Sequence, residues 1–123
     1  MKYFTLTLLS VFSFALIAAA QNASQKVVIK TPTVQCEMCK KKIESYLRRE
    51  PGISAVNVDF KRKTTTVTFL TDRNNIEQIK TAIANLGYDA EDVSADEDAY
   101  KKLPKCCKKP EDREPAKPAD KKE

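Results

Sequence analysis

The chain has no histidine and no tryptophan among its 123 residues. Without histidine, a metal site has no imidazole ligand, and the usual general base of hydrolytic enzymes is missing as well. The net charge of +5 is mild, and the basic residues are interleaved with acidic ones rather than gathered in a stripe with aromatic partners. These absences argue against a nucleic-acid-binding protein and against an enzyme of the triad type.

The first twenty residues form a segment of their own. A basic start with Lys2 precedes an apolar run from Phe4 to Ile17, and the segment closes on three alanines that end at Ala20. This is the pattern of a secretory signal peptide, and the run is too short for a comfortable membrane span. We therefore expect cleavage after Ala20, a short linker over residues 21–25 and a periplasmic or secreted mature protein. An uncleaved N-terminal anchor is the alternative.

Residues 26–93 show the patterns of a small α+β domain. Runs of β-branched and aromatic residues, alternating with polar ones, predict strands over residues 26–31, 53–60, 64–70 and 88–93. Apolar residues at helical spacing predict helices over residues 37–49 and from about 75 to 86, the second with Asn74 as its cap and Gly87 at its end. The order is that of the ferredoxin-like βαββαβ fold, with two helices on one face of a four-stranded antiparallel sheet.

Residues 94–123 differ in character from this domain. They contain nine Lys or Arg, eight Asp or Glu and four Pro, with little apolar content. A segment of this kind buries too little surface to offset the entropy lost on ordering, so we expect a charged, mostly disordered tail. The adjacent pair Cys106 and Cys107 is the exception within it.

Cys36 and Cys39 lie two residues apart at the expected junction of a loop and the first helix. This spacing lets both sulfurs converge on one point, while the free N–H groups of a helix start and the nearby Lys40–Lys42 favour thiolates. Two sulfur ligands select a soft ion, with Cu(I) as the first expectation and Hg(II), Zn(II) or Cd(II) as alternatives. Such an open site can pass its ion to an incoming thiolate, with no bond-breaking chemistry and no small-molecule substrate.

The residues around these cysteines resemble the heavy-metal-associated domain family. The resemblance covers about residues 26–93 and rests on VQCEMC at residues 34–39, on PGI leading to VNV at residues 51–58, and on AI to LGY at residues 82–88. Its members include copper chaperones, domains of copper-transporting P-type ATPases and periplasmic mercury-binding proteins. The resemblance implies that Cys36 and Cys39 bind the metal, and that Tyr88 packs over the site. It also implies a metal-transporting membrane protein or another metallochaperone as the partner.

Two departures from the family pattern concern the metal loop itself. Thr33 and Val34 stand where the family usually has Gly-Met, and Val34 can fill the apolar anchoring role of that Met more stiffly. Glu37 between the cysteines adds negative charge beside the ion, which would shift the preference toward a divalent metal.

The four cysteines leave several readings open. Cys36 and Cys39 could form a structural disulfide, or the couple of a thiol-disulfide oxidoreductase, because exported proteins can oxidise. Cys106 and Cys107 could form an auxiliary soft-metal site, complete a four-thiolate zinc interaction module, or remain exposed without a partner; the chain after Val93 is long enough to reach back. Thiolates of two copies could also share an ion in a metal-bridged homodimer. The leading hypothesis is an exported metallochaperone or scavenger.

Overall fold

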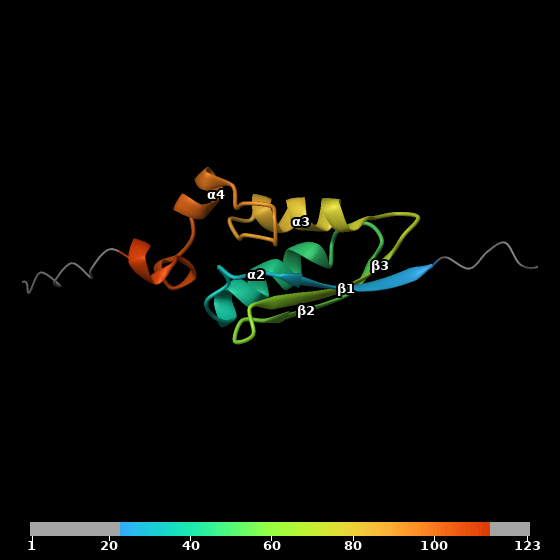
Figure 1. The fold of residues 1–123 in the computed structure, drawn as a ribbon, viewed down its shortest axis with the longest axis horizontal. Coiled ribbons are helices and arrows are strands. Elements are labelled where there is room, and N and C mark those ends of the chain that lie inside the picture. Colours follow the sequence, from blue (N-terminus) through green and yellow to red (C-terminus); the bar gives the residue numbers. More distant parts are fainter. Residues whose placement is uncertain (1–22, 114–123) are drawn as a thin grey trace, which may run out of the picture.

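The computed structural model describes residues 23–113, so the expected signal peptide and its cleavage site lie outside the described residues. Two helices pack on one face of an antiparallel sheet, and a short helical segment continues beyond them (Figure 1). In chain order the elements are β1 (Ser24–Lys30), α2 (Glu37–Leu47), β2 (Ile53–Asp59), β3 (Thr64–Leu70), α3 (Ile76–Asn85), α4 (Glu97–Lys101) and the 3₁₀-helices η1 (Lys105–Cys107) and η2 (Pro110–Asp112).

The sheet has three strands in the order β1-β3-β2, with β3 antiparallel to both neighbours. Along β3, alternate side chains are buried because successive residues of a strand point to opposite faces. The buried face consists of Ile29 of β1, Val56 and Val58 of β2, and Thr65, Val67 and Phe69 of β3. The predicted inward faces of the second and third strands are confirmed at these positions.

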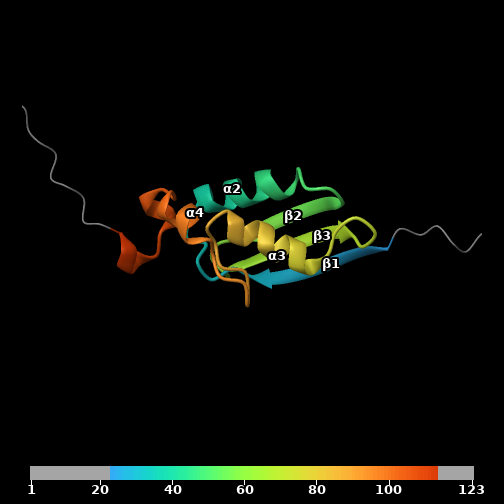
Figure 2. The same cartoon turned by 90° about the horizontal axis from the view of Figure 1, so that it is seen from above.

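The helices close the core from one side. In α2, Cys39, Ile43 and Leu47 are buried, and they recur at the spacing that places residues on one helical face. In α3, Ile79 and Ile83 do the same, and the two helices lie side by side over the strands (Figure 2). Cys39 is therefore a core residue as well as a member of the cysteine pair.

The predicted fourth strand over residues 88–93 is wrong. Ala90 and Val93 instead exchange both backbone hydrogen bonds across a tight turn, each of 2.9 Å. Glu91 within this turn has a φ of 54°, a left-handed conformation that an extended strand does not contain. The Glu91 N–H donates to the Lys30 carbonyl at 2.9 Å, and the Lys30 N–H donates to Glu91 Oε1 at 3.4 Å, so the turn is tied to the end of β1.

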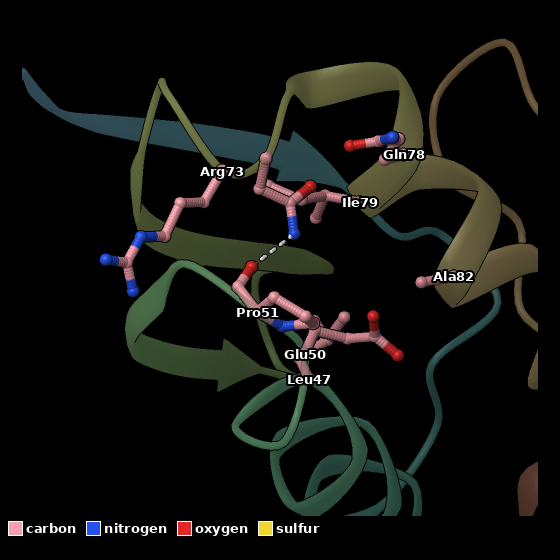
Figure 3. Close-up of a pocket in the computed structure, with 8 residues that line it drawn as sticks. Leu47, Glu50, Pro51, Arg73, Gln78, Ile79 and Ala82 are labelled. Atoms are coloured by element: carbon pink, nitrogen blue, oxygen red, sulfur yellow. Dashed lines mark hydrogen bonds between the residues drawn. The ribbon is translucent and has the colours of Figure 1, made fainter.

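The predicted cap of the second helix is wrong by one residue. The side chain of Asn75, not Asn74, accepts the Gln78 backbone N–H at 2.8 Å and thereby caps α3. Asn74 is used differently: its Nδ2 donates to the Pro51 carbonyl at 2.9 Å and ties the start of α3 to the turn after α2, the dashed line in Figure 3. The predicted glycine at the end of α3 is confirmed, since Gly87 has a φ of 95° and follows the last turn.

The expectation of a mobile tail does not describe residues 94–113. They form α4, η1 and η2, and they bury Leu103 and Cys107 against the core. The charge-rich composition gave no indication that Leu103 and Cys107 would be buried, because their contact partners lie far away in the sequence. Among residues 23–113, none of the helices combines the length and the apolar composition needed to cross a membrane.

Candidate metal centre

The loop between β1 and α2 delivers Cys36 to the start of the helix. Cys36 is the N-cap residue of α2, and Cys39 lies in its first turn. The loop is held from three sides: Val34 is buried in the core, the Asp89 backbone N–H donates to Thr33 Oγ1 at 2.8 Å, and the Lys63 ammonium group donates to the Val34 carbonyl. Such contacts fix the loop before any ion arrives.

The structure brings all four cysteine sulfurs into one cluster as free thiols. Cys36 Sγ lies 3.4 Å from Cys39 Sγ and 3.8 Å from Cys107 Sγ. Cys107 Sγ in turn lies 3.9 Å from Cys106 Sγ. The sulfurs of Cys36, Cys106 and Cys107 all lie within 4.8 Å of one another, which is compatible with a shared ion. The pair in the tail thus returns to the pair at the helix start.

Burial differs sharply among the four thiols. Cys39 and Cys107 are buried, Cys36 is half-buried, and Cys106 is exposed. The cluster therefore runs from the core to the surface, with Cys36 between the two ends. An incoming ion or a partner's ligand would meet Cys106 and Cys36 first.

The cluster concentrates its negative charge on Cys36. Burial opposes ionisation of this thiol, but the backbone N–H groups of Cys39 and Met38 and the thiols of Cys106 and Cys39 outweigh it and lower the pKa of Cys36 to about 7. Proximity to Cys36, followed by burial, raises the pKa of Cys106. Burial, followed by Cys39, raises the pKa of Cys107. The geometry thus favours a thiolate at Cys36 near neutral pH and disfavours ionisation of Cys106 and Cys107.

Tyr88 lies beneath the sulfurs and is fully buried. Its hydroxyl group has no hydrogen-bond partner among the described residues, which is rare for a buried polar atom. Burial first, and then Cys107 and Cys39, raise the pKa of Tyr88, so the phenol stays neutral and faces those two thiols. Tyr88 thus lies beside Cys39 and Cys107, whereas its packing over a bound metal remains a prediction.

Two residues of the site were missed by the sequence analysis. Met38 lies between the cysteines, and its Sδ is 3.9 Å from Cys106 Sγ; a thioether inside the motif is a soft ligand type and could have been singled out. Lys63, which follows β2 in the turn before β3, holds the loop carbonyl of Val34. No local sequence pattern predicts this role of Lys63, because its partner Val34 lies 29 residues away.

One hollow beside the helices lies away from the cysteines. It has a volume of about 280 Å³ and is open to solvent between the end of α2 and the start of α3, lined among others by Leu47, Arg73 and Ile79 (Figure 3). None of the four cysteines lines it. The four sulfurs gather at the opposite end of α2.

An α+β domain with a cysteine pair at the start of its first helix, and with no histidine in the chain, has the architecture of a soft-metal-binding domain. The family model of the heavy-metal-associated domain matches residues 28–89. The chain belongs to the heavy-metal-associated domain family, as its sequence resemblance indicated.

Known relatives agree with this assignment. The mercuric transport protein periplasmic component of Shewanella putrefaciens is 32% identical over 84 residues, which cover 68% of this chain and 91% of that protein. The crystal structure of oxidized MerP from Ralstonia metallidurans CH34 superimposes with a TM-score of 0.54 at 26% identity, over 56% of this chain and 96% of that one. The N-terminal domain of a potential copper-translocating P-type ATPase from Bacillus subtilis, in its Cu(I)-loaded state, gives 0.54 at 25% identity, over 56% and 86%.

Proposed function

We propose that this protein is an exported carrier of a soft metal ion, which Cys36 and Cys39 bind and which an incoming thiolate of a partner removes. The observation that carries the proposal is the 3.4 Å separation of the two sulfurs at the start of α2. It gains support from relatives named for mercuric transport and for copper translocation.

The proposed chemistry begins at Cys36. With a pKa of about 7, this thiol is substantially ionised at neutral pH and presents a half-buried thiolate. The ion binds there first, and Cys39 then loses its proton as it becomes the second ligand. Because each ligand is a thiolate and no histidine is available, Cu(I) and Hg(II) suit the pair better than hard ions do. Zn(II) and Cd(II) remain alternatives that the titration below separates.

Transfer follows from the open coordination of a two-thiolate site. A thiolate of a metal-transporting membrane protein, or of another metallochaperone, can bond to the ion before Cys36 or Cys39 leaves. The net change is one metal–sulfur bond formed for each one broken, with a proton returned to the departing thiol and no change of oxidation state.

Location outside the cytoplasm draws support from the signal-peptide pattern of residues 1–20 and from relatives named as periplasmic components.

An anaerobic titration of the intact chain with Cu(I), Hg(II), Zn(II) and Cd(II) tests the proposal. We expect sulfur-to-metal charge-transfer absorption that saturates at one soft ion per chain. The double variant Cys36→Ser/Cys39→Ser should lose more affinity than the roughly 10–100-fold that removal of an outer hydrogen-bond partner costs a metal site. Ser54→Ala, on the far end of β2, is the matched control and should bind as the parent does.

Two results would contradict this function. The first is soft-ion binding by the Cys36→Ser/Cys39→Ser variant that equals the parent's. The second is sustained turnover in an insulin-reduction assay, which would place the Cys36–Cys39 couple among thiol-disulfide oxidoreductases instead.

A further inference from the structure

Residues 94–113, which we call the C-terminal segment, lie outside the part of the chain that matches the family. The family model ends at residue 89, whereas the cysteine cluster takes two of its sulfurs from η1, at Cys106 and Cys107. In Figure 1 this segment, drawn in orange to red, lies at the end of the molecule where α2 begins. The two-cysteine site of the family is thus accompanied here by a second pair that the same chain supplies.

The segment is attached by specific contacts rather than by its charges. The Asp96 backbone N–H donates to the Ala84 carbonyl at 2.9 Å and joins the start of α4 to the last turn of α3. Leu103 is buried, and the Tyr100 hydroxyl both donates to Asp112 at 2.7 Å and accepts the Lys109 N–H at 2.9 Å. These contacts fix the chain on both sides of the cysteine pair.

Gly87 shows how closely the segment approaches the domain. A Cβ atom at this position would lie 2.9 Å from the Tyr100 backbone nitrogen and 3.0 Å from the Ala99 carbonyl carbon. Backbone approaches of this kind need a residue without a side chain. The domain and the segment are therefore fitted to each other, which places the sulfurs of η1 at a defined position.

We propose, building on the function above, that Cys106 and Cys107 are internal ligands that join Cys36 in a three-thiolate site for a soft metal ion. Three sulfurs bonded at about 2.3 Å to one ion lie about 3.8 Å apart in tetrahedral and about 4.0 Å apart in trigonal-planar geometry. The sulfurs of Cys36 and Cys107 are 3.8 Å apart, and those of Cys106 and Cys107 are 3.9 Å apart. A linear two-thiolate ion would need about 4.6 Å between its ligands by the same bond length, so the sulfurs of Cys36 and Cys39, which lie 3.4 Å apart, would have to separate to hold an ion in that geometry.

Cys36 belongs to both sets of ligands. An ion that enters on Cys36 and Cys39 can therefore exchange Cys39 for the two thiols of η1 while the bond to Cys36 persists. Cys106 and Cys107 each lose a proton as they bind and Cys39 regains one, so no oxidant or reductant is involved. Lys105 and Lys108, which flank the pair in sequence, add positive charge near the extra thiolates. The internal ligands occupy the coordination positions that a partner's thiolates would otherwise take, and so they hold the ion more tightly and slow its release.

X-ray absorption of the intact chain loaded with one equivalent of Cu(I) counts the sulfur ligands directly. We expect three sulfurs in the parent and in Cys39→Ser, and two in Cys106→Ser/Cys107→Ser. Tethered ligands act at a high effective concentration, so the double variant should lose affinity for Cu(I) by about 10²-fold in competition with a chromogenic Cu(I) chelator. It should also transfer its ion to that chelator faster than the parent does.

The outcomes separate this inference from the function on which it depends. Two sulfurs in the parent, or an unchanged sulfur count and affinity in Cys106→Ser/Cys107→Ser, would overturn the three-thiolate site while leaving the Cys36–Cys39 carrier intact. Failure of the parent to bind Cu(I) or Hg(II) at all would overturn both. Because serine replaces each thiol with little change in volume, the melting temperature of the variants should confirm that they are folded.

Discussion

Tyr88 packs in the hydrophobic core and also places its hydroxyl group beside the cysteine thiols. Its ring is fully buried, and its hydroxyl ends beside the thiols of Cys39 and Cys107 without a conventional hydrogen bond. A buried hydroxyl without a partner costs free energy, because it gives up its bonds to water. Such a cost is understandable where a thiolate is to be accommodated, since a phenol can donate to a sulfur anion.

Replacement of Tyr88 by Phe, in the chain without metal, tests whether the unpartnered hydroxyl destabilises the fold. Removing the unpartnered hydroxyl should raise the free energy of unfolding by about 1 kcal/mol, measured by urea denaturation. Tyr46→Phe, at an exposed position of α2, is the control and should change stability little. A loss of stability in Tyr88→Phe would instead show that the hydroxyl already makes a favourable hydrogen bond to a thiol.

At the scale of elements, local sequence patterns were enough to predict the strands and helices whose apolar residues recur with a regular period. The alternation in residues 53–59 and 64–70, and the helical spacing of Ile79 and Ile83, gave the right elements because burial on one face decides them. They failed over residues 88–93, where backbone hydrogen bonds and ion pairs to other elements hold a turn. Lys80 of α3 lies 2.9 Å from Asp92 and 3.1 Å from Glu91, which draws this stretch toward the helix as a turn.

This ion cluster predicts a pH dependence. The Lys80 ammonium lowers the pKa of Asp92, so the carboxylate stabilises the fold above the unfolded-state pKa of about 3.9, and this contribution disappears as pH falls through the lower folded-state value. Asp92→Asn should therefore be less stable than the parent at pH 7, whereas the two should converge near about pH 2. Thermal unfolding at both pH values measures the difference. Asp98→Asn, in an exposed pair with Lys101, serves as the control.

An equal deficit of Asp92→Asn at both pH values would contradict this account, because it would assign the effect to packing or to the conformation of the turn. The same experiment bears on why residues 88–93 were predicted as a strand although they form a turn. If the charge of Asp92 stabilises the turn, a method based on strand periodicity has no means of finding it.

At the scale of the whole molecule, the cysteine pair at residues 36 and 39 was predictable and the cluster of four was not. The CxxC spacing and the following helix are local, whereas the return of Cys106 and Cys107 depends on contacts such as Asp96 to Ala84. Composition alone pointed to disorder, since a few buried residues such as Leu103 weigh little against so many charges. Order in this segment depends on contacts with the rest of the domain, which its composition does not reveal.

Gly87 and Gly52 form a matched pair for testing that docking. Both have positive φ, at 95° and 79°, so alanine at either position should cost more than about 1 kcal/mol. Only at Gly87 would the new Cβ meet α4; at Gly52 it would meet Arg73, at 2.7 Å. Hydrogen exchange should therefore quicken at the Leu103 and Cys107 amides in Gly87→Ala and stay near the parent's rate in Gly52→Ala. Equal protection of these amides in both variants would contradict the close fit.

The close approach at Gly87 has a practical bearing on how this protein is studied. A fragment cut where the family match ends, at residue 89, would retain the loop, both main helices and Cys36 with Cys39. It would discard the cover over the Tyr88 side of the core and half of the thiols in the chain. Affinities and release rates obtained on such a fragment would describe the module with Cys36 and Cys39 alone, whereas a chain that also carries Cys106 and Cys107 reports the behaviour of all four thiols.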